Sequence, residues 1–94
     1  MKIYISGKIT GDPNYREKFA AAEKFYYEQG AIVLNSATHP GGMDRSDYMR
    51  ICFAMIDSAD TVVMLNDWPT SEGAKAEFAY AKYIGKNIAK TTRF

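Results

Sequence analysis

The sequence predicts an α/β fold in which helices cover a parallel β-sheet. Segments with strand patterns and helix patterns alternate along the chain, as in folds of this class. The run TVVML at 61–65 is uniformly apolar, which is typical of a central parallel strand. Because crossovers between parallel strands are right-handed, we expect a doubly wound, Rossmann-like (flavodoxin-like) domain with four to five strands.

The first half of the chain predicts two strands and one helix. The segment 2–6, KIYIS, alternates and is rich in β-formers, and a loop with two glycines, GKITG, follows it. Asp12 is expected to cap the next helix, with Pro13 at its first position. That helix, 13–29, ends at Gly30 and precedes a short strand at 31–34. Its expected buried stripe comprises Tyr15, Phe19, Ala22 and Tyr26.

The second half predicts two more helices and two more strands. A Pro-Gly-Gly loop at 35–45 leads to a helix at 46–59, and strand 61–65 leads to a helix at 71–85 that Thr70 or Ser71 caps. A short strand at 87–90 follows, and the last residues look loose. The expected inward residues of helix 46–59 are Tyr48, Ile51, Cys52, Met55 and Ile56.

Composition argues against several classes of function. The 94 residues suffice for one small domain, 1–94, and the net charge of +1 gives no basic footprint for a nucleic acid polymer or a membrane surface. A single cysteine and the lack of a signal or membrane-spanning pattern favour a cytoplasmic protein. Thirteen aromatic residues, seven Tyr, five Phe and one Trp, suit a small core or a subunit interface.

Glu77 is the most informative residue. On a helical wheel it falls near the middle of an apolar face formed by Ala74, Phe78, Ala81 and Ile84. A buried carboxylate needs a partner, or it takes up a proton. The alternative is a glutamate at the open end of the helix that reaches solvent or an ion pair.

Two loops are expected to meet beside Glu77, at the carboxyl ends of the strands. GKITG gives close backbone approach to a phosphate or a sugar, or it is a plain turn. In NDWPTSEG, Asp67 ends a strand, and Ser71 and Gly73 open a helix whose free amides favour an anion. Ser71 also serves as an N-cap. Trp68 either stacks on a base or covers the sheet edge.

The order YISGKITG, then AD-x-V-V, then S-x-G-x-x-x-E resembles the nucleoside 2-deoxyribosyltransferase superfamily. The similarity is greatest to its short bacterial and phage members and extends to the 2'-deoxynucleoside 5'-phosphate N-hydrolases. It covers about 2–84. The resemblance implies a small-molecule nucleoside or nucleotide substrate, and a homodimer or larger assembly whose sites a neighbouring subunit completes.

The resemblance also implies residue roles. Glu77 would be the nucleophile that attacks the deoxyribose and displaces the base, and Tyr4 would position it. Ser71 and Gly73 would hold a 5'-phosphate. The residues expected to line the base and sugar pocket are Gly7, Lys8, Ile9 and Gly11.

One position departs from the family pattern. Cys52 stands where the family has an aspartate that assists proton transfer to the leaving base, eight residues before Asp60. A thiol is a weak proton donor, and buried structural cysteines are common. Asp57 or Asp67 are alternative donors.

Three readings remain open. The chain is a glycosidase or transferase, a nucleotide-derivative binding protein with little or no catalysis, or an interaction module with a relic pocket. No metal is expected, because the acidic residues lack ligand spacing. No flavin or nicotinamide cofactor is expected, because the Gly-rich fingerprint is absent. His39 is expected to be an exposed loop residue.

Overall fold

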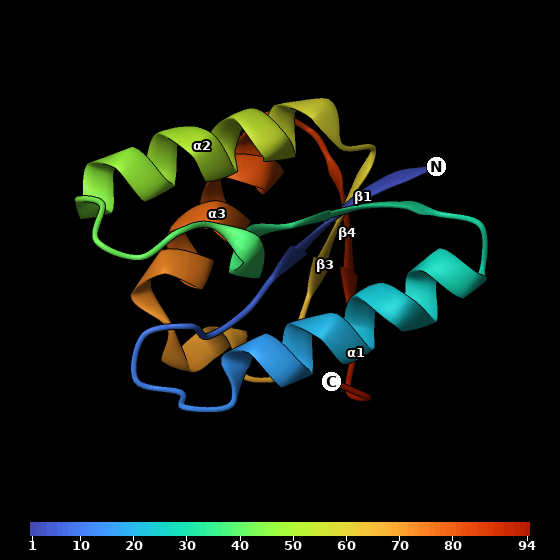
Figure 1. Ribbon diagram of the computed structural model, residues 1–94. Coiled ribbons are helices and arrows are strands. Elements are labelled where there is room, and N and C mark those ends of the chain that lie inside the picture. Colours follow the sequence, from blue (N-terminus) through green and yellow to red (C-terminus); the bar gives the residue numbers. More distant parts are fainter.

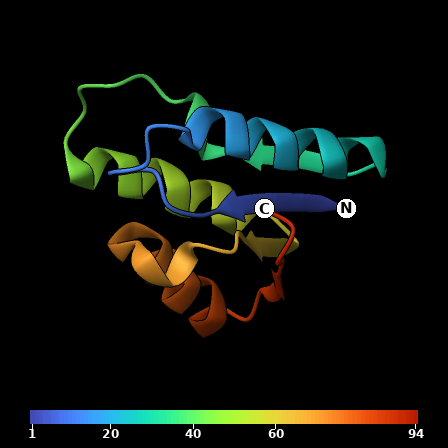
Figure 2. The ribbon, with the colours of Figure 1, turned by 90° about the horizontal axis from the view of Figure 1, so that it is seen from below.

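The fold is an α/β sandwich of one parallel sheet between helices. The computed structural model describes residues 1–94, and its four strands lie in the order β2-β1-β3-β4. Figure 1 shows helix α1 on one face of the sheet and helices α2 and α3 on the other, and Figure 2, seen from below, shows the strands side by side in this order. The predicted α/β, flavodoxin-like class is confirmed.

The strands are short and all pair in parallel. They span β1 Lys2–Ser6, β2 Ile32–Asn35, β3 Thr61–Met64 and β4 Asn87–Lys90. Strand β1 pairs with both β2 and β3, so that Tyr4 lies opposite Leu34 and Val62. The chain therefore reverses its direction of winding between β1 and β3, which is where such folds bind ligands.

The helices begin and end close to the predicted positions, with one informative difference. They span α1 Tyr15–Glu28, α2 Arg45–Ser58 and α3 Glu72–Tyr83. Helix α1 begins two residues later than expected, and its N-cap position is Asn14 rather than Asp12. The prediction was wrong because the Asp12 carboxylate accepts hydrogen bonds from the Asn14 amide and the Lys18 ammonium group instead.

Alternation along the strands divides the interior into two cores. Ile5 and Leu65 belong to the core beneath α1, together with Phe19 and Ala22. Tyr4 points to the opposite face, where the core beneath α2 and α3 contains Cys52, Ile56, Val62, Met64, Ala74 and Ala81. Ser6 follows Tyr4 by two residues and therefore faces the same helices.

Two expectations about packing were wrong. Ile51 and Ile84 are 38% and 39% exposed rather than inward. Ile84 caps the end of α3, where Gly85 turns the chain away with φ of 83°, and Ile51 lies beside the stripe that Cys52 and Ile56 bury.

The C-terminus is also not loose. The Phe94 ring lies 5.6 Å from the Phe25 ring of α1, and the Arg93 guanidinium lies 4.5 Å over Phe25. The last residues therefore pack on α1. None of the three helices has the length and apolar character needed to cross a bilayer.

Candidate functional site

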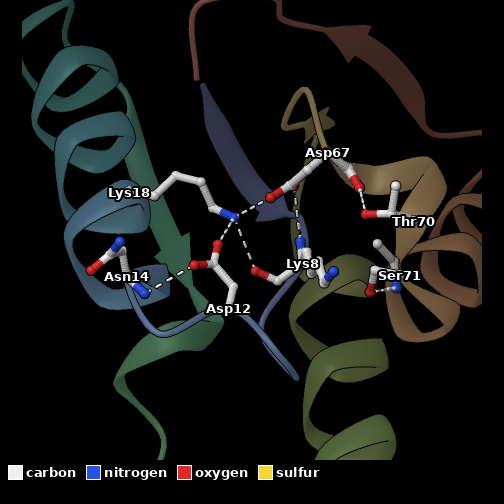
Figure 3. A network of polar contacts seen from close by, with 8 residues as sticks. Lys8, Asp12, Asn14, Lys18, Asp67, Thr70 and Ser71 are labelled. Carbon is white, nitrogen blue, oxygen red and sulfur yellow. Dashed lines mark hydrogen bonds and ion pairs between the residues drawn. The ribbon is translucent and has the colours of Figure 1, made fainter.

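The loops after β1 and β3 meet, as the sequence predicts. The Lys8 amide donates a hydrogen bond of 3.1 Å to Oδ1 of Asp67, which joins the GKITG loop to the loop that leads into α3 (Figure 3). The Thr70 hydroxyl donates to the Asp67 carbonyl at 2.7 Å and tightens the same turn. The two loops therefore form one structural unit at the carboxyl edge of the sheet.

Lys18 of α1 is the centre of this unit, and sequence reasoning missed it. Its ammonium group donates to Oδ2 of Asp12 at 2.8 Å, to the Lys8 carbonyl at 3.0 Å, and to Oδ2 of Asp67 (Figure 3). Burial lowers the pKa of Lys18, but the two carboxylates outweigh it and leave the pKa above its usual value. Both carboxylate oxygens of Asp67 thus accept hydrogen bonds. The sequence signal that could have identified Lys18 is its spacing of six residues from Asp12, across the start of α1.

Glu77 is buried on the face of the sheet that α2 and α3 cover, opposite α1. It is 7% exposed, and the Ser6 hydroxyl donates a hydrogen bond of 2.7 Å to its Oε1. Burial raises the pKa of Glu77, while the Ser6 hydrogen bond and the nearby Tyr4 and Cys52 side chains oppose the rise. The expectation of an inward-facing carboxylate is thus met, and the alternative of a glutamate open to solvent or in an ion pair is not.

Tyr4 and Cys52 lie beside Glu77, so the structure brings together the three residues predicted to be catalytic. The Tyr4 hydroxyl is enclosed and has no hydrogen-bond partner of good geometry. Burial and the neighbouring Glu77 charge raise the pKa of Tyr4 well above its usual value. Burial, with the Glu77 charge second, raises the pKa of the Cys52 thiol to about 11. The thiol is therefore protonated at neutral pH and gives up its proton poorly.

Two hydroxyl groups complete this cluster, and the sequence analysis named neither. Ser6 ends β1, and Ser36 follows β2 in the short 3-10 turn Ser36–Thr38. The Ser36 hydroxyl lies near both Tyr4 and Cys52 and lowers the pKa of each. Ser6 was detectable, because it lies two residues after Tyr4 on a strand and shares its face. Glu77 takes part in none of the ion pairs of the chain, so no cation neutralises this carboxylate.

The N-terminus of α3 lies after the Asp67 turn. Ser71 is the N-cap, and its hydroxyl oxygen accepts a hydrogen bond of 3.1 Å from the Ala74 amide. Gly73 is exposed in the first turn, and a side chain there would meet only the Ser71 hydroxyl at 3.9 Å. Ser71 as an N-cap is confirmed, and space for a ligand group remains above Gly73.

The glycine-loop residues have different surroundings. A Cβ on Gly7 would lie 2.9 Å from Cβ of Leu65, so this glycine permits close packing of the loop on the residue that follows β3. Ile9 packs against the α1-side core, away from Glu77. Gly11 has a φ of 85°, which permits the turn toward α1. These contacts show why the loop needs its glycines; whether it also lines a pocket stays a prediction.

Three other candidates lie outside the cluster. The Trp68 ring stacks on Phe78 at 4.6 Å between centroids, so it covers the core at the edge of the sheet. Asp57 accepts a hydrogen bond from the Tyr80 hydroxyl at 2.6 Å and is exposed. His39 is half-buried, with Nε2 enclosed and unpartnered, rather than the exposed residue expected.

A surface cavity of about 450 Å³ lies between α1 and the end of β2. None of the predicted site residues lines it. Its lining residues are Arg16, Ala20, Glu23, Lys24, Tyr27, Asn35, Ala37 and Thr38.

Comparisons with known proteins agree with the fold. The family model described as "Domain of unknown function (DUF4406)" matches residues 1–90. No curated protein matches the sequence. Among solved structures, a 2-desoxiribosyltransferase from Leishmania mexicana superposes with a TM-score of 0.76 at 17% identity. The match covers 95% of this chain and 62% of the other, so this chain has a deoxyribosyltransferase-like fold and spans less than two thirds of that protein.

Proposed function

We propose that this chain, which belongs to the DUF4406 family, cleaves the N-glycosidic bond of a 2'-deoxynucleoside or its 5'-monophosphate. The observation that carries the proposal is the buried Glu77 carboxylate at the carboxyl end of β1, held by Ser6 at 2.7 Å. The deoxyribosyltransferase-like fold supports the same assignment. A carboxylate that no cation neutralises is costly to bury, and such groups concentrate at functional sites.

The reaction has two steps, as in retaining glycosidases. A Glu77 oxygen attacks C1' of the deoxyribose, the bond from C1' to the base nitrogen breaks, and the electron pair leaves with the base, which takes up a proton. Water or the nitrogen of a second base then attacks C1' and releases the Glu77 carboxylate. Two displacements at C1' retain its configuration.

The remaining predicted residues would bind the substrate. The amides at the start of α3, near Ser71 and Gly73, favour a 5'-phosphate because the helix dipole is positive there. The loop residues Gly7, Lys8 and Gly11 and the backbone of Ile9 would line the sugar and base, with Asp67 fixing the loop through the Lys8 amide. The single domain 1–94, the homodimer and the cytoplasmic location stay predictions.

A second function is supported by one observation. Cys52 has a pKa of about 11, so it is a weak acid toward a leaving base, and general acid assistance typically contributes ~10²–10⁴ in rate. The alternative is a protein that binds a nucleotide derivative in the same place with little or no turnover.

The deciding experiment is incubation of the purified protein with the four deoxynucleosides and their 5'-monophosphates, with free base followed by chromatography. Base release that disappears in Glu77→Ala and persists in Glu28→Ala, an exposed residue at the far end of α1, supports the glycosidase. Acid-quenched intact-protein mass spectrometry should then detect a deoxyribosyl adduct on Glu77. Saturable binding without base release would favour the binding protein instead.

A further inference from the structure

Ser6 has a contact with Glu77 that the resemblance gives to Tyr4. The family pattern implies that Tyr4 positions the nucleophile, but here the Tyr4 hydroxyl has no hydrogen-bond partner of good geometry. The Ser6 hydroxyl instead donates to Oε1 of Glu77 at 2.7 Å, and Ser6 itself is fully buried. An O–H···O bond of this length to a carboxylate is well formed.

This bond distinguishes the two oxygens of the carboxylate. No hydrogen bond within the chain ends at Oε2 of Glu77, and the enclosed polar side-chain atoms without a partner are the Tyr4 hydroxyl and His39 Nε2. Within the chain, the hydrogen bond of good geometry to Glu77 thus ends at Oε1. One oxygen is tied to the strand by Ser6, and the other is not.

We propose that Ser6 is a positioning residue, whose hydroxyl holds Oε1 of Glu77 and leaves Oε2 as the oxygen that attacks the sugar. This assignment rests on the proposed function. A rigid strand end is well suited to the task, because β1 is bonded on both sides, to β2 and β3. The bond also favours the ionised form of Glu77, which is the form that acts as a nucleophile.

The other titratable groups that face Glu77 are Tyr4 from β1 and Cys52 from α2. Both have a pKa above its usual value, so both remain neutral across the acid and neutral range. A titration observed at this cluster between acid and neutral pH therefore belongs to Glu77. A shift of that titration in a Ser6 variant then reports the lost Ser6 hydrogen bond.

The test compares Ser6→Ala with wild type in two measurements. The first is the pH profile of kcat/KM for base release, whose acid limb reports the ionisation of Glu77. The second is an NMR titration of the Glu77 carboxyl carbon, which needs no activity. We expect Ser6→Ala to move the acid limb and the midpoint of the NMR titration to higher pH. We also expect it to lower kcat by about 10-fold or more, with KM nearly unchanged.

Two further variants sharpen the result. Ser6→Thr retains the hydroxyl and should recover much of kcat. Ser58→Ala removes an exposed hydroxyl bonded to the Ala54 carbonyl and should match wild type. If wild type is active and Ser6→Ala has the same acid limb and the same kcat, the role of Ser6 is overturned and the proposed function stands. Absence of base release from wild type would overturn the proposed function, and the role of Ser6 with it.

Discussion

The ammonium group of Lys18, on α1, is bonded to the carboxylate of Asp67, in the loop that follows β3. The same nitrogen reaches Asp12 and the Lys8 carbonyl. One side chain thus joins the loop after β1 to the loop after β3 (Figure 3). The two loops that border the proposed site are thus held together by a residue that belongs to neither, in addition to the direct bond from the Lys8 amide to Asp67.

Lys18→Met should loosen both loops. We expect a melting temperature lower by several degrees, because two partly buried carboxylates lose their cation. The hydrogen bond from Lys18 is the main cause of the lowered pKa of Asp12, so stability from this pair is present above the ordinary Asp pKa and is lost as pH falls through the folded pKa. The deficit of the variant should therefore shrink in acid.

The matched control for Lys18→Met is Lys24→Met, on the exposed side of the same helix. Thermal unfolding followed by circular dichroism at neutral and acid pH measures both. Equal effects of the two substitutions would show that the network does not stabilise the loops.

Gly7→Ala should destabilise the protein. The added Cβ would lie 2.9 Å from Cβ and 3.0 Å from Cδ1 of Leu65, which is fully buried, so either the loop or Leu65 must shift. Overpacking of this kind typically costs ~1–3 kcal/mol. Denaturant titration measures it against Gly41→Ala, where nothing lies within 4 Å. A loss no larger than that of Gly41→Ala would contradict the packing role.

Gly73→Ala separates ligand binding from folding. Its Cβ would meet only the Ser71 hydroxyl at 3.9 Å, and alanine is favoured over glycine in a helix by up to ~1 kcal/mol. We expect equal or greater stability, together with weaker use of 5'-monophosphates than of nucleosides if a phosphate approaches this turn. Unchanged relative KM values for the two substrate types would place the phosphate elsewhere.

Glu77→Gln should stabilise the protein more at neutral than at acid pH. Burial raises the pKa of Glu77 above its ordinary value of 4.5, so the folded chain prefers the protonated form. The stability this group contributes is full below its unfolded pKa and is lost as pH rises through the folded pKa. Glutamine is neutral throughout and avoids that loss.

Denaturant titrations of wild type and Glu77→Gln at pH 4 and pH 7 give the comparison. A gain in the free energy of unfolding that is larger at pH 4 than at pH 7 would contradict the assigned direction.

Cys52→Asp restores the acid that the family pattern has at this position. We expect base release to rise by about 10²-fold and stability to fall, because a second carboxylate would be buried beside Glu77. Cys52→Asn has nearly the same shape and no acid, so it should not raise the rate. Equal rates for the Asp and Asn variants would show that the leaving base receives its proton from another group.

The sequence alone predicted the class of fold and the central residue of the site. Strand alternation, continuous apolar runs and a helical wheel are local patterns, so the four strands, the three helices and the inward direction of Glu77 could be derived from the sequence. The resemblance gave Tyr4 and Cys52 their expected roles, and the structure places both beside Glu77. The meeting of the loops after β1 and β3 followed from the geometry of parallel sheets.

Only the tertiary structure decided which side chains are partners. Asp12 looked like a helix cap, but the Lys18 ammonium group and the Asn14 amide occupy its carboxylate. Tyr4 looked like the partner of Glu77, but the Ser6 hydroxyl has the hydrogen bond. Hydrogen bonds and ion pairs depend on distances of a few ångströms between segments far apart in the chain, such as the 71 positions between Ser6 and Glu77. Periodicity in one segment carries no information about those distances.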